Sequence, residues 1–190
     1  LVQESEVRMA AISCPNLSLP TYFPKDRKGI LVFALRGSGC WATLLDGEEQ
    51  WKEMRVSDHM ETRQACFLES MELGHRNAER VKKIKELLSV QVPSVFLDSQ
   101  AKHVVLAAGE GDVFLRMLSP GNPNFREKIW DVAPGALVIE EAGGCVTDLE
   151  GYSLDFGAGP TLAHNQGFIA TNGALHFQVL NAVQKTAAPT

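Results

Sequence analysis

The sequence lacks the features that would place the protein in a disulfide-rich, zinc-binding, membrane or secreted class. Its four cysteines, Cys14, Cys40, Cys66 and Cys145, lie far apart and form no Cys-x-x-Cys pair, so neither a zinc site nor a disulfide framework is predicted. No run approaches the roughly 18 apolar residues that cross a bilayer. The first residues also lack the basic start and apolar segment of a signal peptide. We therefore expect a reducing, cytoplasmic setting and no membrane partner.

The charge balance has no basic excess. Lysine and arginine number 18 against 23 acidic residues, which gives a formal net charge of −5 at pH 7. This leaves no basic footprint for nucleic acid, so a small anionic ligand would need local positive groups or metal ions. Apolar residues are plentiful, because 45% of the 190 residues are hydrophobic and can form a substantial buried core.

Apolar and polar residues recur at spacings that are typical of strands and helices in alternation. The expected strands are residues 7–13, 29–35, 40–45, 64–69, 93–97, 113–118, 144–148, 153–156 and 168–171. The expected helices are residues 77–89, 99–108, about 131–142 and 172–185. Alternating strands and helices predict an α/β protein with connections over both faces of a sheet.

The polar stretch 46–63 separates two groups of these elements. It is typical of a solvated loop or domain junction, and a boundary near Ser57 predicts one unit over residues 1–57 and a second over residues 58–190. Within the first unit, Arg36-Gly37-Ser38-Gly39 lies between two strands. A hairpin turn is favoured there over a phosphate-binding loop, because no helix with a Walker lysine follows.

Residues 129–148 organise the second half of the chain. Trp130 is predicted to be a buried aromatic, Asp131 lies where a helix N-cap is expected, and Pro134 falls in the first turn. A Gly-Gly pair then ends the helix. From the residues alone, Asp131 is either a capping carboxylate or one whose other oxygen faces a hydrated cation. Trp130 packs either in the core or against a purine.

Three further polar residues stand where a partner is needed. Ser99 lies at a strand-to-helix junction, where a hydroxyl and free N–H groups form an anion site. Lys102 lies in the first turn of that helix, where a cation is mildly unfavourable unless an anion lies beside it, or else it bends into water. Arg116 alternates with apolar residues and needs an ion-pair partner, either Asp112 or a group on a neighbouring loop.

Several separate motifs follow one another in the second half of the chain. They are Trp130-Asp131-Val132-Ala133-Pro134-Gly135, Glu141-Ala142-Gly143-Gly144, Thr147-Asp148, Gly151 and Leu154-Asp155-Phe156. Together they resemble the signature of the lithium-sensitive, metal-dependent inositol monophosphatase superfamily. Asp98-Ser99-Gln100-Ala101-Lys102 and Lys128-Ile129-Trp130-Asp131 are most similar to the 3'(2'),5'-bisphosphate nucleotidases of fungi and plants. The resemblance runs from about Val7 to about Leu180 and implies a layered α/β/α/β sandwich of the inositol monophosphatase type.

The resemblance implies roles for five residues. Asp131 would bind a divalent cation, with Mg²⁺ the expected ion. Ser99, Lys102 and Arg116 would contact a small-molecule nucleotide, together with His75. The implied reaction is Mg²⁺-dependent hydrolysis of the 3'-phosphate of adenosine 3',5'-bisphosphate to AMP and phosphate, with the 5'-phosphosulfate analogue as a further expected substrate.

The sequence also departs from the pattern of that family. Arg76 replaces a small hydroxyl residue that is expected beside His75. The family's main metal motif, Asp-Pro-(Ile/Leu)-Asp-Gly-Thr, and its upstream Glu do not occur, and no Asp-Pro dipeptide is present. We therefore expect a fragment that lacks the N-terminal part of the first domain, holds no catalytic residue and is impaired in turnover by itself.

Three alternatives stay open on the sequence alone. The chain could belong to a phosphatase of inositol phosphates, or it could be a non-catalytic nucleotide-binding module. It could also be a gene product that never folds, because half of a first-domain sheet would expose strand edges and apolar surface.

Overall fold

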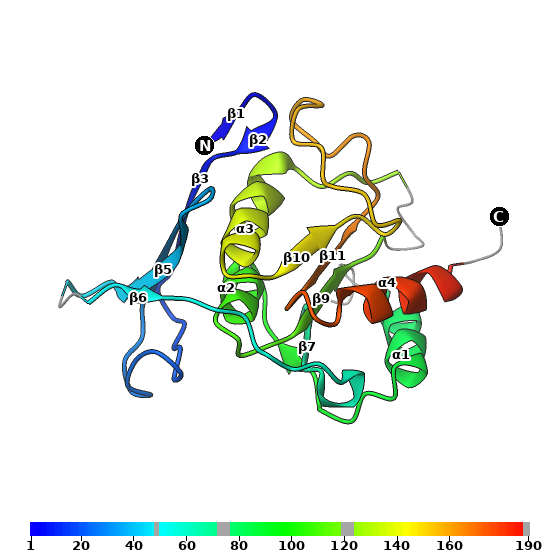
Figure 1. Ribbon diagram of the computed structural model, residues 1–190, viewed down its shortest axis with the longest axis horizontal. Coiled ribbons are helices and arrows are strands. Elements are labelled where there is room, and N and C mark those ends of the chain that lie inside the picture. Colours follow the sequence, from blue (N-terminus) through cyan, green and yellow to red (C-terminus); the bar gives the residue numbers. More distant parts are fainter. Residues whose placement is uncertain (48–49, 72–76, 119–123, 188–190) are drawn as a thin grey trace.

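The computed structural model describes residues 1–47, 50–71, 77–118 and 124–187, and Figure 1 shows how their strands and helices are arranged. The strands are β1 (Val2–Gln3), β2 (Glu6–Val7), β3 (Met9–Cys14), β4 (Ile30–Leu35), β5 (Gly39–Leu44), β6 (Lys52–Glu53), β7 (Phe67–Glu69), β8 (Val95–Phe96), β9 (Val113–Arg116), β10 (Cys145–Thr147) and β11 (Phe168–Thr171). The helices are α1 (Ala78–Leu87), α2 (Ala101–Ala107), α3 (Ile129–Glu141) and α4 (His176–Lys185), with a 3₁₀ turn at Thr62–Gln64.

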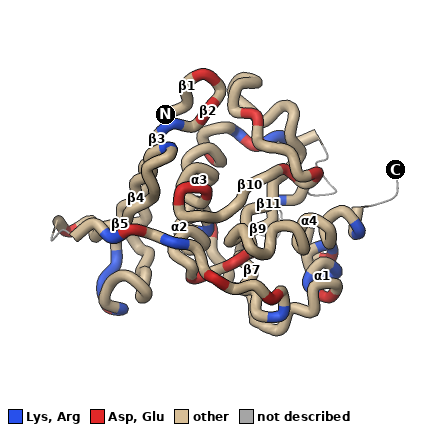
Figure 2. The backbone as a smooth tube through the Cα atoms, viewed as in Figure 1, with Lys and Arg blue, Asp and Glu red and all other residues tan. Residues whose placement is uncertain are grey.

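The first sheet contains β3, β4, β5 and β6 in that order, and all its neighbours are antiparallel. Alternate side chains of β3 and β4 are buried, so that Ala10 pairs with Ala34 and Ile12 pairs with Val32 on one face. No residue of β3, β4 or β5 carries a charge, and these strands are therefore tan in Figure 2.

The second sheet has the order β10, β11, β9, β7 and β8. The strand β7 runs parallel to both β8 and β9, whereas β11 runs antiparallel to β9 and β10. Mixed pairing of this kind needs long connections between the parallel strands, and these connections contain α1 and α2.

Helices separate the sheets and also cover the far side of one of them. The middle helices α2 and α3 lie between the two sheets, and α1 lies beside α4 on the other face of the second sheet (Figure 1). The layers thus follow the order sheet, helices, sheet, helices. The predicted α/β class and the layered sandwich are confirmed.

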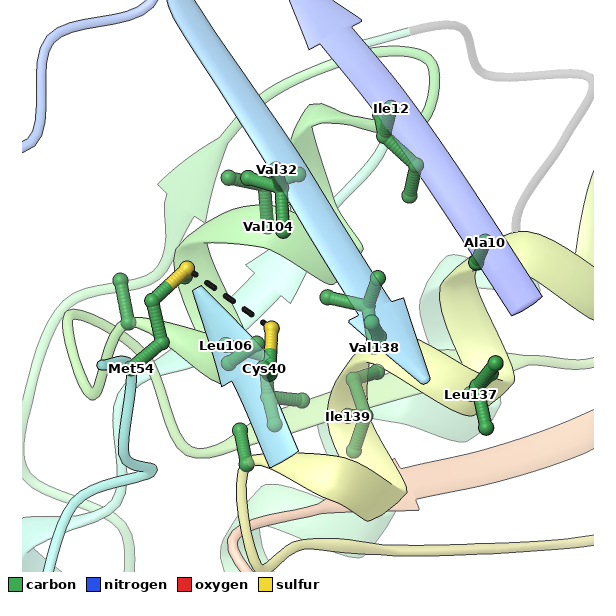
Figure 3. Close-up of a cluster of buried hydrophobic side chains, with 14 of the residues drawn as sticks. Ala10, Ile12, Val32, Cys40, Met54, Val104, Leu106, Leu137, Val138 and Ile139 are labelled. Atoms are coloured by element: carbon green, nitrogen blue, oxygen red, sulfur yellow. Dashed lines mark hydrogen bonds between the residues drawn. The ribbon is translucent and has the colours of Figure 1, made fainter. Parts of the chain in front are cut away.

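Figure 3 shows the core between the first sheet and the middle helices. Apolar side chains from the strands point toward those of α2 and α3; the labelled ones are Ala10, Ile12, Val32, Cys40, Met54, Val104, Leu106, Leu137, Val138 and Ile139. Cys40 Sγ lies 3.9 Å from Met54 Sδ. Burial, with a smaller contribution from Glu141, raises the pKa of Cys40 to about 12, so this thiol stays protonated and unreactive.

The same cluster of buried side chains contains residues from both predicted units, such as Ile12 and Leu137. The boundary near Ser57 stays a prediction. Within the ranges that the structure describes, no helix combines the length and the apolar character needed to cross a bilayer. The cytoplasmic setting and the lack of a nucleic-acid partner also stay predictions.

The helix starts differ from the predicted ones in instructive ways. Asn77 caps α1 as predicted, because its side chain accepts a 3.3 Å hydrogen bond from the N–H of Arg80. By contrast, Asn172 does not start α4. Its Oδ1 accepts a 3.2 Å bond from the N–H of Leu175, which is itself the residue before the first helical turn.

The predicted strand 153–156 is not formed. The buried carboxylate of Asp148 accepts hydrogen bonds from the N–H groups of Glu150 and Tyr152 and from the side chain of Asn165. These bonds shape the turn before the segment, in the manner of an Asx turn. Within the segment, the N–H of Asp155 donates a 2.8 Å hydrogen bond to Oδ1 of Asn165 instead of to a neighbouring strand.

Candidate active site

A pocket of about 320 Å³ lies where the start of α2, the end of β9 and the first turn of α3 meet. It is lined by Ser70, Asp98, Ser99, Gln100, Lys102, His103, Phe114, Arg116, Glu127, Asp131, Val132 and Phe168. Four of the five predicted site residues therefore share one hollow, although they come from α2, β9, α3 and the turn before α2. His75, the fifth, lies outside the described residues, and so does its neighbour Arg76.

Ser99 occupies an unusual backbone conformation at the mouth of this pocket. Its φ is +60°, which is rare for a residue other than glycine, and its side chain is exposed. Gln100 rather than Ser99 immediately precedes α2, and α2 is only seven residues long. The strained conformation costs about 1–3 kcal/mol, and such costs are concentrated at functional sites.

Lys102 does not bend into water, which was one of the alternatives. The residue is only 5% exposed, and its Nζ donates a 3.1 Å hydrogen bond to the carbonyl of Leu97. The ammonium also lies 5.2 Å from the ring centroid of Phe114, within the range of a cation–π contact. The positive charge is thus held inside the wall of the pocket.

Arg116 forms the ion pair that the sequence required, but its partner is not Asp112. Its Nε donates a 2.5 Å hydrogen bond to Oε1 of Glu127, and the two side chains are 19% and 9% exposed. Glu127 precedes α3, so the neighbouring-loop alternative is confirmed. Asp112 instead accepts a hydrogen bond from the backbone N–H of Cys66 and lies within hydrogen-bond distance of His59.

Asp131 is the third residue of α3 and not its N-cap. The cap position belongs to Lys128, whose extended backbone forms a bridge with Thr161, so the N-cap lies three residues earlier than predicted. Pro134 consequently lies in the second turn and not in the first. The side chain of Asp131 is exposed, and Gln100 Nε2 donates a hydrogen bond to its backbone carbonyl.

Trp130 is not a core residue. It is 59% exposed, and Lys128 Nζ lies 5.7 Å from its ring. Since Trp130 is not among the residues that line the pocket, the alternative of a purine-stacking ring stays a prediction.

The sequence reasoning missed His103. This imidazole is 4% exposed and lies between two aromatic rings, with its centroid 5.2 Å from that of Phe114 and 5.9 Å from that of Phe168. Burial, with a smaller contribution from Lys102, lowers the pKa of His103 to about 3, so the ring is neutral. Gly135 makes room for it, because a Cβ on that residue would lie 2.3 Å from the ring. In the sequence, Gly135 next to Pro134 was the signal that could have indicated a close contact of this helix with another side chain.

The acidic residues near the end of α3 have structural partners. Glu140 Oε2 accepts a 2.6 Å hydrogen bond from Arg36, and the carboxylate of Glu141 accepts bonds of 2.8 Å from the N–H groups of Gly37 and Gly39. The turn from Arg36 to Gly39 joins β4 to β5, so the hairpin prediction is confirmed and its N–H groups are not free for phosphate.

The donors around the pocket do not form a complete metal site. Glu127 is paired with Arg116, and Asp98 accepts a 3.0 Å hydrogen bond from the N–H of Met71. No group of three or more His, Cys, Asp or Glu side chains with metal-binding geometry occurs among residues 1–47, 50–71, 77–118 and 124–187. Asp98 and Asp131 both line the pocket and are exposed, but they belong to no such group, and one carboxylate by itself holds a hard divalent cation poorly.

Comparison with protein families gives a match over residues 1–187 to the model described as the inositol monophosphatase family. The chain belongs to the inositol monophosphatase family. The family resemblance predicted from the motifs is therefore confirmed, and the match includes the segments that supply Ser99, Lys102, Arg116 and Asp131.

Two curated members of this family are similar along nearly the whole chain. A protein of Schizosaccharomyces pombe named 3'(2'),5'-bisphosphate nucleotidase is 38% identical over 192 residues, which cover 100% of this chain and 53% of the relative. A protein of Oryza sativa with the same name is 40% identical over 190 residues, which cover 97% of this chain and 52% of the relative. The chain thus spans about half the length of these relatives.

Solved structures of the inositol monophosphatase family have the same fold. The Thermotoga maritima IMPase TM1415 matches with a TM-score of 0.61 and 21% identity, over 85% of this chain and 58% of that protein. An IMPase/NADP phosphatase that was solved as a complex with NADP and Ca²⁺ matches with a TM-score of 0.58 and 19% identity, over 80% and 50% of the two chains. At such identities the likeness establishes the fold alone.

Proposed function

We propose that this chain carries the nucleotide-binding site of a 3'(2'),5'-bisphosphate nucleotidase, which removes the 3'-phosphate of adenosine 3',5'-bisphosphate. One observation carries the proposal: Ser99, Lys102 and Arg116 line the same pocket as Asp131. Two cations and a hydroxyl around one hollow suit a ligand with more than one phosphate group. The names of the relatives supply the nucleotide class.

Each cation would make a different contribution to binding. Arg116 is held by Glu127, so its planar guanidinium loses little further freedom when it donates to a phosphate. Lys102 would move its ammonium from the carbonyl of Leu97 toward the ligand and would serve as a compact point charge. Ser99, which is exposed at the pocket, would add a hydroxyl donor.

Asp131 is our candidate ligand for a divalent cation, and Mg²⁺ is the ion that we expect. A neighbour of the same fold was solved with a nucleotide and Ca²⁺, which supports this pairing of ligand and metal. A bound divalent ion would neutralise phosphoryl oxygens and lower the pKa of a coordinated water. Because the described residues contain no group of three or more metal-binding side chains, we assign binding to this chain and expect turnover to be impaired.

Two alternatives differ in ligand or in outcome. A sugar-phosphate enzyme of the family would prefer an inositol phosphate over the nucleotide. A non-catalytic module would bind adenosine 3',5'-bisphosphate without releasing phosphate.

Calorimetric titration of the 190-residue chain with adenosine 3',5'-bisphosphate tests the proposal. We expect saturable binding that Lys102→Met and Arg116→Met each weaken by about tenfold or more, since each charge-assisted hydrogen bond contributes about 1.5–3 kcal/mol. Lys82→Met is the matched control, because the Lys82 side chain is 79% exposed on α1 and should leave the affinity unchanged.

The same titration with inositol 1-phosphate separates the alternatives. Equal affinity for the two ligands, or no nucleotide binding by a folded chain, would contradict the proposed ligand class. Phosphate release with Mg²⁺ is then measured beside Asp131→Asn. Release that disappears in this variant would mean that the chain completes its metal site in some other way.

A further inference from the structure

The imidazole of His103 has hydrogen-bonding capacity that the folded chain does not use. The residue is 4% exposed, and neither Nδ1 nor Nε2 has a hydrogen-bond partner within residues 1–47, 50–71, 77–118 and 124–187. Burial and the charge of Lys102 lower the pKa of the ring, and the nearby carbonyl of Gln100 opposes them without making a hydrogen bond of acceptable geometry. Buried polar groups nearly always have a partner, because an unpaired one is costly.

The packing around His103 fixes the ring and distinguishes its two nitrogens. Phe114 and Phe168 lie against it, with centroid separations of 5.2 Å and 5.9 Å. On the side of α3, the ring atoms nearest to a Cβ built on Gly135 are Cγ, Cδ2 and Nδ1. Nε2 is therefore the ring nitrogen that lies farther from Gly135, and the residue as a whole lines the candidate pocket.

The wall of this pocket combines two cations with one uncharged hydrogen-bonding group. Lys102 Nζ and the ring centroid of His103 each lie 5.2 Å from the ring centroid of Phe114. Arg116 follows Phe114 by two residues on β9 and so shares its face of the strand. Adenosine 3',5'-bisphosphate has a matching pattern, because its two phosphates are joined through a ribose whose 2'-hydroxyl is uncharged. A hydroxyl both donates and accepts, so it suits either tautomer of a neutral imidazole.

We propose that His103 reads the sugar of the nucleotide through a hydrogen bond between Nε2 and the ribose 2'-hydroxyl. This inference rests on the proposed nucleotide-binding function and adds to it a residue that distinguishes ribose from deoxyribose. The ring is already held by its neighbours, so it loses little freedom when the ligand binds. A site that is built to pair with a hydroxyl disfavours the analogue that lacks it, because the buried nitrogen then stays unpaired.

Calorimetric titration of the 190-residue chain with adenosine 3',5'-bisphosphate and with its 2'-deoxy analogue tests the proposal. We expect the native chain to bind the ribose ligand about tenfold more tightly. His103→Phe keeps an aromatic ring but removes both nitrogens, so it should bind the two ligands with about equal affinity. His164→Phe is the matched control, because the His164 side chain is 72% exposed and is not among the described residues that line the pocket. The control should keep the tenfold preference.

The pair of ligands separates failure of this inference from failure of the proposed function. If a folded native chain binds neither ligand, the proposed nucleotide site is wrong and the sugar contact falls with it. If the chain binds both ligands without a ribose preference, only the role of His103 is overturned. A purely structural role of His103 would weaken both ligands equally in His103→Phe and leave the preference unchanged, which would also overturn the proposal.

Nitrogen NMR of the native chain provides a test that does not depend on the folding of a variant. The resonances of His103 belong to the imidazole that stays neutral to the lowest pH, since its pKa is lowered to about 3, chiefly by burial. We expect the Nε2 resonance to shift when the ribose ligand binds and to shift much less with the 2'-deoxy analogue. Equal shifts with the two ligands would contradict the proposed hydrogen bond.

Discussion

The two sheets of this molecule are made from similar strands but have different surroundings. In the second sheet, every residue of β11, Phe168–Thr171, is buried because helices cover both faces. In the first sheet, β4 reads Ile-Leu-Val-Phe-Ala-Leu, an apolar run of the kind typical of strands buried on both faces, yet only alternate residues are fully buried. A strand made of apolar residues therefore indicates that both faces of its sheet can be covered by other elements. It does not show that both faces are covered.

The largest effect should come from the helix layer that both sheets share. Leu137 of α3 is fully buried in the core between them, so Leu137→Ala removes contacts and leaves a cavity. We expect a loss of about 3 kcal/mol in the free energy of unfolding, measured by urea denaturation. A loss below about 1 kcal/mol would mean that this core is loosely packed and that the comparison of the two sheets does not hold.

A slightly smaller effect is expected where α3 touches α2. Gly135→Ala would place a Cβ 2.3 Å from the ring of His103, so the helices must separate, at a cost of about 2 kcal/mol. Removing the ring in the double variant Gly135→Ala with His103→Ala should make the two changes non-additive. Strict additivity in the unfolding titrations would count against a direct clash.

The buried imidazole should also make stability depend on pH. The pKa of His103 is lowered to about 3 from an ordinary value of 6.5, mainly by burial, so the unfolded chain binds a proton at a pH where the folded chain does not. The stability conferred by the neutral ring is present above pH 6.5 and is lost progressively as the pH falls toward 3. Between pH 6.5 and 5.5 the loss from this residue is about 1 kcal/mol.

His103→Gln should remove that part of the slope when unfolding is measured across this pH range. The same change at Lys82, which has a side chain 79% exposed on α1, provides the control and should leave the slope nearly unchanged. An identical slope in the native chain and in His103→Gln would show that other groups dominate acid unfolding.

The smallest effect is expected on the face of the first sheet that is turned away from α2 and α3. Leu35→Ala removes a side chain that is 41% exposed and should change the unfolding free energy of the monomer by less than about 0.5 kcal/mol. A loss comparable to that of Leu137→Ala would mean that this face is covered.

Much of the fold followed from local chemistry. Asn77 caps α1, and Gly143, with φ +93°, ends α3 near the predicted residue, because only these positions offer the needed side-chain acceptor or backbone freedom. The predicted start of α3 was wrong for a different reason. The extended backbone of Lys128 is fixed by Thr161, which lies 33 residues further along the chain, and no local pattern contains that contact.

The candidate site shows the same division. The residue types at Ser99, Lys102 and Arg116 suggested an anion, but only the packing of α2, β9 and α3 brings them to one pocket. The sequence left two alternatives for the ion-pair partner of Arg116, Asp112 or a group on a neighbouring loop. The path of the chain before α3 decides between them, because it places Glu127 beside the guanidinium. Trp130 shows the limit of prediction from local sequence. An aromatic residue beside an apolar helix was predicted to be buried in the core, whereas its position on the helix turns it to solvent.

The contacts of α3 with the hairpin between β4 and β5 affect how the chain emerges from the ribosome. Glu140 reaches Arg36 across 104 residues, and Glu141 reaches Gly39 across 102 residues. At roughly 5–20 residues per second, the first sheet is synthesised several seconds before α3 is available to cover it. During that interval α3 cannot yet cover the apolar sheet, so chaperone holding is most needed between the synthesis of β6 and that of α3.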